Sequence, residues 1–217
     1  MTLPLQSRKL LFLFLLRACF PGVQGAASVL AALTTGLALA AFSPAACAAW
    51  DVQQLMDSLA QNKSGRATFV EKKYIAVLDK PVESSGELVY TAPDALEKRT
   101  FKPRPEAMVV KGGELFVERG RQKHRLQLQA YPELAAFIDS IRGTLAGDRK
   151  ALERNYRLSV EGTPERWTLQ LQPLDEKMQA VVQRIAISGV REQVRDIEII
   201  QADGDRSVMS IENLATP

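Results

Sequence analysis

Apolar and polar side chains alternate along much of the chain after Gly65. In the stretch RWTLQLQ (166–172), for example, single polar residues separate Trp167, Leu169 and Leu171. Successive side chains of a β-strand point to opposite faces of its sheet, so this period of two predicts a strand with one apolar face. Turn residues separate eleven such segments. The predicted strands are 66–77, 82–91, 95–102, 106–111, 114–119, 123–129, 155–161, 165–173, 179–188, 193–201 and 205–212.

Three segments favour helices instead of strands. Asp51, with Gln54 three positions later, can cap a first helix, and the second begins after Tyr131 with a proline at its first position. Asp148 can cap a short third helix that ends at Glu153. The apolar faces of the two longer helices are Val52, Leu55, Met56 and Leu59 in the first, and Leu134, Phe137, Ile138, Ile141 and Leu145 in the second. Strands joined by short turns, with no alternation of strand and helix, predict an antiparallel meander in one domain.

The alternation also predicts which side chains of the last five strands face the interior. The inward sets are Tyr156, Leu158 and Val160; Trp167, Leu169 and Leu171; Val181, Ile185 and Ile187; Ile197 and Ile199; and Met209 and Ile211. The charge runs EKKY (71–74), RGRQKHR (119–125) and REQVRD (191–196) are predicted to be solvated strand faces and loops.

The apolar side of such a sheet is larger than the predicted helices can cover. Eleven strands about 4.8 Å apart and roughly six residues long present one face on the order of 1,000 Å². The two longer helices shade only about 400 Å² of that face. Contiguous exposed apolar patches of the remaining size are rare on soluble monomers. The sheet is therefore expected to curl on itself, with the helices closing its mouth, and a curl this wide leaves room for a lipid-like guest.

The first 49 residues differ in composition from the rest. Before Asp51 the only charges are basic: Arg8, Lys9 and Arg17. An apolar run of small residues at 26–42 precedes an A-x-A pattern at 46–48. This arrangement predicts a secretory signal peptide at 1–49, cleaved near Ala48 or Ala49, and an exported domain at 50–217. The run is also long enough for a retained membrane anchor, and Cys47 leaves a lipid anchor open.

Removal of this segment changes the charge and the cysteine content. The whole chain has 28 basic and 25 acidic residues; removing the three basic residues of the segment leaves 25 of each. Both cysteines, Cys19 and Cys47, also lie in it. A neutral balance lacks the basic footprint of nucleic-acid binding proteins. A chain without cysteine has no disulfide, no thiol nucleophile and no cysteine-based metal site.

Candidate catalytic and metal-binding residues are few. His124 is the only histidine, and its place in an alternating strand favours exposure. No nucleophile–base set and no G-x-S-x-G motif accompanies it. One histidine cannot build a histidine-based metal site, and DGDR at 203–206 fits a hairpin turn better than a calcium loop. We therefore expect no enzyme activity, no metal and no cofactor.

Four short motifs and the order of the elements point to a known family. The motifs are ATFVEKK (67–73), with Phe69 at an aromatic position, GELVYTAPDAL (86–96), VVKGGELFVE (109–118) and DRSVMSIEN (205–213). They are similar to the first strand, the second strand with its proline turn, a turn-and-strand segment and the last strand of one family. With the order helix, six strands, helices and five strands, the chain resembles the periplasmic lipoprotein carriers of the LolA family.

The resemblance implies a mainly β (α+β) fold, a strongly curved, half-open antiparallel barrel of about eleven strands with a helical lid. It implies a carrier that holds acyl chains of a lipoprotein or another acylated cargo, without catalysis, and exchanges them with an inner-membrane export complex and an outer-membrane acceptor. We expect a monomer, with residues 131–145 as a mobile lid. The residues expected to line the acyl cavity and the lid are Phe69, Leu88, Tyr90, Leu96, Met108, Val110, Leu115, Leu134, Phe137, Ile138, Ile141, Trp167, Leu169, Leu171, Ile185, Ile187, Ile197, Ile199 and Met209.

Two departures from the family bear on the cargo. The carriers have a basic pair before the turn proline, whose arginine tethers the lid, and this sequence has Thr91-Ala92 there. The sequence also ends at Pro217, soon after the last predicted strand, where the carriers continue. We expect a closed state that is held differently and a cargo that need not be a lipoprotein. A sensor or scaffold domain in envelope signalling, or a role in glycolipid or polyketide-lipid export, stays open; an enzyme acting on lipid is disfavoured by the missing nucleophile and base.

Overall fold

Eleven antiparallel strands form one sheet in the computed structural model, which describes residues 50–214. The strands are β1 (Ser64–Tyr74), β2 (Val82–Thr91), β3 (Ala95–Lys102), β4 (Glu106–Lys111), β5 (Glu114–Arg119), β6 (Gln122–Gln127), β7 (Tyr156–Thr163), β8 (Arg166–Pro173), β9 (Val182–Val190), β10 (Gln193–Gln201) and β11 (Arg206–Asn213). The helices in this part of the chain are α2 (Val52–Leu59), the 3₁₀ turn η1 (Leu128–Ala130), α3 (Pro132–Ala146), α4 (Arg149–Glu153) and α5 (Glu176–Gln179). The predicted signal peptide lies outside the described residues.

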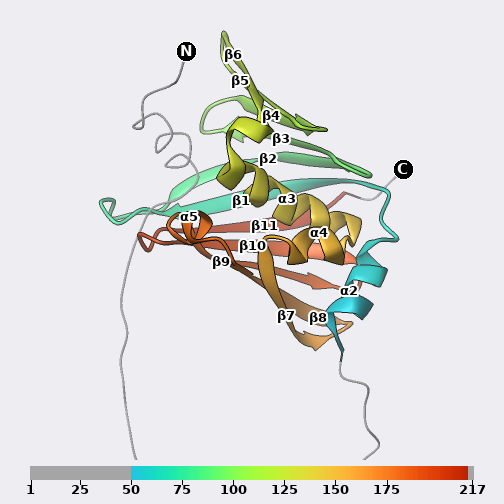
Figure 1. Cartoon of the computed structure of the whole chain (residues 1–217). Helices are drawn as coiled ribbons and strands as arrows, with labels where there is room; N and C mark the ends of the chain where they lie inside the picture. Colours follow the sequence, from blue (N-terminus) through green and yellow to red (C-terminus); the bar gives the residue numbers. More distant parts are fainter. Residues whose placement is uncertain (1–49, 215–217) are drawn as a thin grey trace, which may run out of the picture.

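The first and last strands meet in the middle of the sheet. The strand order is β6-β5-β4-β3-β2-β1-β11-β10-β9-β8-β7, so β6 and β7 form its two edges. Figure 1 shows the sheet bent around α2, α3 and α4, with β3–β6 on one side of the helices and β7–β8 on the other. A sheet with two edges is curved but not closed. The predicted mainly β, strongly curved and half-open architecture is therefore confirmed.

Local sequence explains where α2 begins and where α3 begins and ends. The Asp51 carboxylate accepts from the backbone N–H of Gln54 at 2.8 Å, and the Gln54 side chain accepts from the backbone N–H of Asp51 at 3.1 Å. This is the predicted capping box. Pro132 is the first residue of α3, and Gly147 ends that helix with φ 66°. A Cβ at Gly147 would lie 2.2 Å from the carbonyl oxygen of Met56, so glycine also lets α3 end close against α2.

The strand predicted at 179–188 begins later than the alternation indicates. Asp175 caps the short helix α5, and the strand therefore starts only at Val182. A register shift between β9 and β10 skips Gln183 and pairs Gln201 with Val182. The bulge turns Val182 into the core, where it is fully buried, whereas Val181, which was predicted to face inward, is half-buried.

Strands β1 and β6 are shorter than predicted. β1 ends at Tyr74, after which the backbone N–H of Leu78 donates to the carbonyl oxygen of Ile75 at 2.8 Å and turns the chain. β6 ends at Gln127 because the next three residues form η1, which places Leu128 in the interior. The first change leaves a longer β1–β2 loop, and the second shortens an edge strand.

Two apolar clusters lie on the concave side of the sheet. The larger cluster joins α2 and α4 to β7–β11 and β1, and its buried members are Leu55, Met56, Leu59, Ala67, Leu152, Tyr156, Trp167, Leu169, Leu171, Met178, Val182, Ile185, Ile187, Val194, Ile199 and Ile211. The smaller cluster joins α3 and η1 to β4 and β5, and its buried members are Val110, Leu115, Leu128, Leu134 and Ile138. Phe137 of α3 packs against both clusters.

Candidate functional site

The nineteen residues predicted to line an acyl cavity are all buried or half-buried. Those in or against the larger cluster are Leu88, Phe137, Ile141, Trp167, Leu169, Leu171, Ile185, Ile187, Ile197, Ile199 and Met209. Those in or against the smaller cluster are Leu96, Met108, Val110, Leu115, Leu134, Phe137 and Ile138. Phe69 and Tyr90 are buried outside both clusters. The structure thus divides the predicted site between two packed regions, and its ligand-binding role stays a prediction.

One apolar row crosses β2–β6 on the face that α3 covers. The cross-strand register places Tyr90 opposite Leu96, Leu96 opposite Val110, Val110 opposite Leu115, and Leu115 opposite Leu126. The last four of these residues belong to or pack against the smaller cluster, which includes residues of α3. Strand neighbours on one face lie about 5 Å apart, so the row forms a continuous apolar strip across five strands.

Charged side chains share this inner face with the apolar row. Lys98 Nζ lies 2.7 Å from Glu71 Oε2 and 4.8 Å from the centre of the Phe69 ring. Lys73 Nζ lies 3.5 Å from Glu71 Oε1, and the Ser207 hydroxyl donates to the same oxygen at 2.7 Å. The Ser84 hydroxyl also donates to Oε2, at 3.3 Å, so four strands contribute donors to one buried carboxylate and both of its oxygens are satisfied.

The electrostatics of this network keep the carboxylate ionised. Glu71 is 2% exposed. Burial would raise its pKa, but the charges of Lys98 and Lys73 and the hydrogen bonds from Lys98 and Ser207 lower the pKa from 4.5 to about 2. Burial also lowers the pKa of Lys73, which the charge of Glu71 partly opposes.

The sequence prediction for EKKY was wrong at Glu71, because this residue lies on the inner face and not on a solvated one. The alternation that places Phe69 inside places Glu71 on the same face, and this was the available signal. A second ion pair, between Arg119 and Glu106, follows on β4 and β5. Beyond the apolar row, the inner face of β1–β5 therefore carries these ion pairs beside apolar residues such as Leu88 and Met108.

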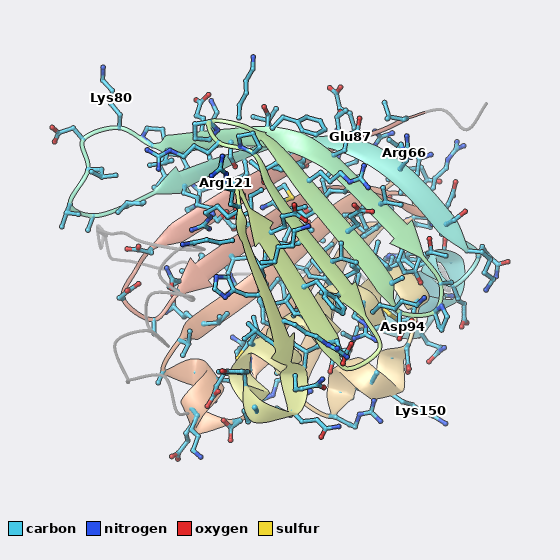
Figure 2. The ribbon with its side chains drawn as sticks, turned by 90° about the horizontal axis from the view of Figure 1, so that it is seen from above. Arg66, Lys80, Glu87, Asp94, Arg121 and Lys150 are labelled. Atoms are coloured by element: carbon cyan, nitrogen blue, oxygen red, sulfur yellow. The ribbon has the colours of Figure 1, made fainter. Side chains whose placement is uncertain are left out.

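A polar contact holds the later part of α3 to two turns of the sheet. Arg142 Nη2 lies 3.1 Å from Asp94 Oδ2 in the β2–β3 turn, and Arg142 Nη1 donates to the carbonyl oxygen of Gly112 at 3.0 Å. The N–H of Gly112, in the β4–β5 turn, donates to Asp94 Oδ2 at 2.9 Å. Figure 2 places Asp94 at the end of its hairpin, beside the helices. We call this group the Arg142 tether; the sequence analysis did not predict it.

Two tyrosine hydroxyls face the helical layer. The Tyr156 hydroxyl donates to the carbonyl oxygen of Ala136 at 3.1 Å, and burial raises its pKa. The Tyr90 hydroxyl is buried without a hydrogen-bond partner among residues 50–214, and burial raises its pKa as well. An unpaired buried hydroxyl is unfavourable, which sets Tyr90 apart from Tyr156.

A pocket of about 380 Å³ lies beside α5, at strands β7, β8 and β9. Its lining residues are Arg157, Gln172, Pro173, Leu174, Gln179 and Gln183. None of the predicted acyl-contacting residues lines it. Within residues 50–214, no group of histidine, cysteine, aspartate and glutamate side chains is arranged to hold a metal ion. No helix in the same range has the length and apolar character needed to cross a bilayer.

Comparison with known families accounts for most of the chain. Residues 44–215 match the family described as outer membrane lipoprotein carrier protein LolA-like. The chain belongs to this LolA-like family. A search of curated proteins gave no match.

Several solved structures are similar to the LolA-like chain at low sequence identity. A LolA superfamily protein from Nitrosomonas europaea is 14% identical, with 78% of this chain and 96% of that chain covered and a TM-score of 0.41. The match to the MucA/MucB complex of Pseudomonas aeruginosa has 14% identity, covers 76% of this chain and 58% of that chain, and has a TM-score of 0.45. A DUF1329 family protein from Desulfovibrio piger is 9% identical over 74% of this chain and 88% of that chain, with a TM-score of 0.40. Similarities of this size assign neither a ligand nor a partner.

Proposed function

We propose that the protein is a periplasmic carrier that binds the acyl chains of a lipoprotein or another acylated molecule and moves them between membranes without chemical change. Membership of the LolA-like family supports a carrier. The expected partners are an inner-membrane complex that supplies the cargo and an outer-membrane acceptor that receives it.

The observation that carries the proposal is the way α3 covers the smaller cluster. Leu134 and Ile138 of this helix pack with Val110 and Leu115 of the sheet. An alkyl chain would make the same kind of contact, and each buried methylene group contributes about 0.8 kcal/mol. A guest and α3 therefore compete for one apolar surface, which is what a carrier that must also release its cargo requires.

Two polar features support a guest with a polar end. The Tyr90 hydroxyl, in the apolar row, lacks a hydrogen-bond partner within the described range. The Arg142 tether is polar and reaches two turns of the sheet, so its contacts can be exchanged for contacts with water when α3 moves. An amphiphile with its chain under α3 and an oxygen near Tyr90 fits this arrangement.

The proposal includes no catalytic step. His124 is exposed on the edge strand β6 and has no buried nucleophile beside it in the sequence or across the β5 register. Its neighbour across the strand pair is Val117. General acid–base chemistry needs a positioned partner, which this site does not supply.

The direct test is displacement of an environment-sensitive acyl probe from the purified protein, with mass spectrometry of bound and released ligand. The Leu115→Asn variant should lower probe affinity by at least about tenfold, since it places an amide in the apolar row. Phe116→Asn is the matched control, because Phe116 is the next residue of β5 and is 40% exposed on the opposite face. Absence of probe binding by the wild type contradicts the carrier proposal, and chemical turnover of the probe would indicate an enzyme.

A further inference from the structure

The loop between β1 and β2 exposes apolar side chains at its tip. Val77 is 74% exposed and Leu78 is 47% exposed, and Tyr74 and Val82 flank them at 37% and 38%. The other large apolar residues exposed in residues 50–214 are Val70, Phe101, Phe116, Leu174, Val190 and Leu214. Single exposed apolar residues are normal, but four within nine positions of one loop form a patch that needs an explanation.

The tip of the loop carries Val77 and Leu78, followed by the exposed charges Asp79 and Lys80, and the base of the loop is polar. At the base, Lys72 Nζ lies 3.2 Å from Glu83 Oε1, and the guanidinium of Arg206 lies 5.3 Å from the centre of the Tyr74 ring. Figures 1 and 2 show the loop extending past the end of the sheet, and Figure 2 shows Lys80 pointing away from the body of the protein. Aliphatic residues at the tip, with an aromatic ring and lysines behind them, match the order of layers from the acyl region of a bilayer to its head groups.

The shape of this tip fits a bilayer better than a protein partner. A stable protein–protein interface needs about 800 Å² on each side, which four side chains on one narrow loop cannot provide. Reversible membrane contact needs much less, since a single inserted acyl chain already gives marginal binding. A convex tip can enter a fluid layer of lipid without a complementary groove.

We propose that residues 74–82, the hairpin tip, insert reversibly into the interfacial layer of a lipid bilayer, with Val77 and Leu78 in the acyl region and Tyr74 and Lys80 at the level of the head groups. This contact is independent of the acyl site under α3. It would place the carrier at a membrane surface while cargo enters or leaves.

The test is binding of the purified protein to vesicles of phosphatidylethanolamine and phosphatidylglycerol, measured by co-sedimentation. The variants Val77→Asp and Leu78→Asp should each lower the partition coefficient by about ten- to hundredfold, the factor for withdrawing one aliphatic side chain from lipid. Val190→Asp is the matched control. Val190 is also exposed, at 39%, but lies at the turn into β10, where the carbonyl oxygen of Glu192 accepts a hydrogen bond from Asn62 of the α2–β1 connection.

A second measurement reports depth of insertion. A Val77→Trp variant should show a blue shift of its emission on addition of vesicles, and quenching by lipids brominated on the acyl chain. Binding should change little with salt, because insertion of apolar groups dominates it. Failure of the wild type to bind vesicles, an equal loss in Val190→Asp, or binding that salt abolishes would each overturn the proposal. Acyl-probe binding should stay unchanged in the hairpin variants, so loss of the carrier function and loss of membrane contact are read separately.

Discussion

The inner face of the sheet differs on the two sides of the β1–β11 pair. On the side of β8 and β9, five side chains have no exposed surface at all: Trp167, Leu169, Leu171, Val182 and Ile185. On the side of β3–β5, the same face carries both apolar and charged residues: Leu96, Val110 and Leu115 with Lys98, Glu106 and Arg119. The first side is a packed core. The second is an apolar strip beneath one helix, bordered by ion pairs.

This difference suggests two roles: the larger cluster stabilises the fold, and the smaller cluster is the place where a ligand would be exchanged. A fully buried cluster contributes most of the apolar burial, and a guest could enter it only by replacing existing packing contacts. The smaller cluster buries fewer side chains, and its cover is α3, which also packs against the larger cluster through Phe137 and Ile141 and is held to two turns by Arg142. Regions with fewer buried apolar contacts open at lower free energy, so the β2–β6 side should open while the β7–β11 side stays folded.

The largest loss of stability should come from a charge introduced among the fully buried side chains of β8 and β9. Leu169→Glu is expected to lower the free energy of unfolding by more than about 4 kcal/mol, because it buries a carboxyl group without a partner. Gln172→Glu, on the exposed face of the same strand, should change it by less than about 0.5 kcal/mol. Leu126→Glu, on the edge strand β6 and half-buried, should cost less than half as much as Leu169→Glu. Denaturant unfolding measures all three, and equal midpoints would show that the two sides do not differ as described.

The second effect is a pH dependence of the free energy of unfolding, which arises from the buried carboxylate of Glu71. The pKa of Glu71 falls from 4.5 to about 2 in the folded state, so its charge stabilises the fold above pH 4.5 and this stabilisation is lost as the pH falls toward 2. A shift of this size corresponds to about 3 kcal/mol. Glu71→Gln should remove most of this loss between pH 5 and pH 2 in equilibrium unfolding. Glu83→Gln, at an exposed pair with Lys72, is the control and should keep the wild-type slope.

The third effect is a local loss of stability that should be confined to α3 and the turns it contacts. Arg142→Gln removes an ion pair and a charged hydrogen bond, and it should lower stability by about 1–2 kcal/mol. Hydrogen exchange should accelerate in α3 and the turns it contacts, with β8 and β9 unchanged. Arg149→Gln breaks an ion pair with Glu153 inside α4 and serves as control. Acceleration throughout the sheet would mean that α3 belongs to the same cooperative unit as the packed side.

The smallest effect is expected at the only histidine. His124 is exposed on β6, so His124→Gln should change stability by less than about 0.5 kcal/mol and leave acyl binding unchanged. Thermal unfolding and probe displacement measure the two quantities. A large loss of either would indicate chemistry at the edge strand that the present structure does not suggest.

The strands were predictable from the sequence where turn residues mark their ends. The predicted ranges 82–91, 95–102, 106–111, 114–119 and 193–201 agree with β2, β3, β4, β5 and β10. Proline or glycine in the turns around β2–β5 fixes their boundaries by local backbone preference, whereas β10 follows the Arg191-Glu192 turn, in which Arg191 has φ 53°. The helix α5 was missed because four residues give no helical period to detect.

The apolar part of the candidate site was predictable in the same way, but its polar parts were not. Alternation places Val110 and Leu115 inside without knowledge of the fold. The network around Glu71 depends on partners 27 and 136 positions away in the sequence, Lys98 and Ser207. Which distant strands come into register, and which turn meets Arg142, is decided by tertiary packing and leaves no local trace. Whether the predicted lining residues contact a ligand stays a prediction.

The pairing of β1 with β11 also bears on how the protein is made. Phe69 lies opposite Ile211, so the central ladder of the sheet cannot form until β11 has been synthesised. Closing so long a stretch of chain costs entropy before any contact forms, which slows folding. Until then β1 has an unpaired edge, which is prone to association with other chains. A nascent chain of this topology therefore cannot complete its sheet until almost all of it has been synthesised, and an incomplete sheet is the state that a holding chaperone can bind and that can still be threaded through a narrow channel.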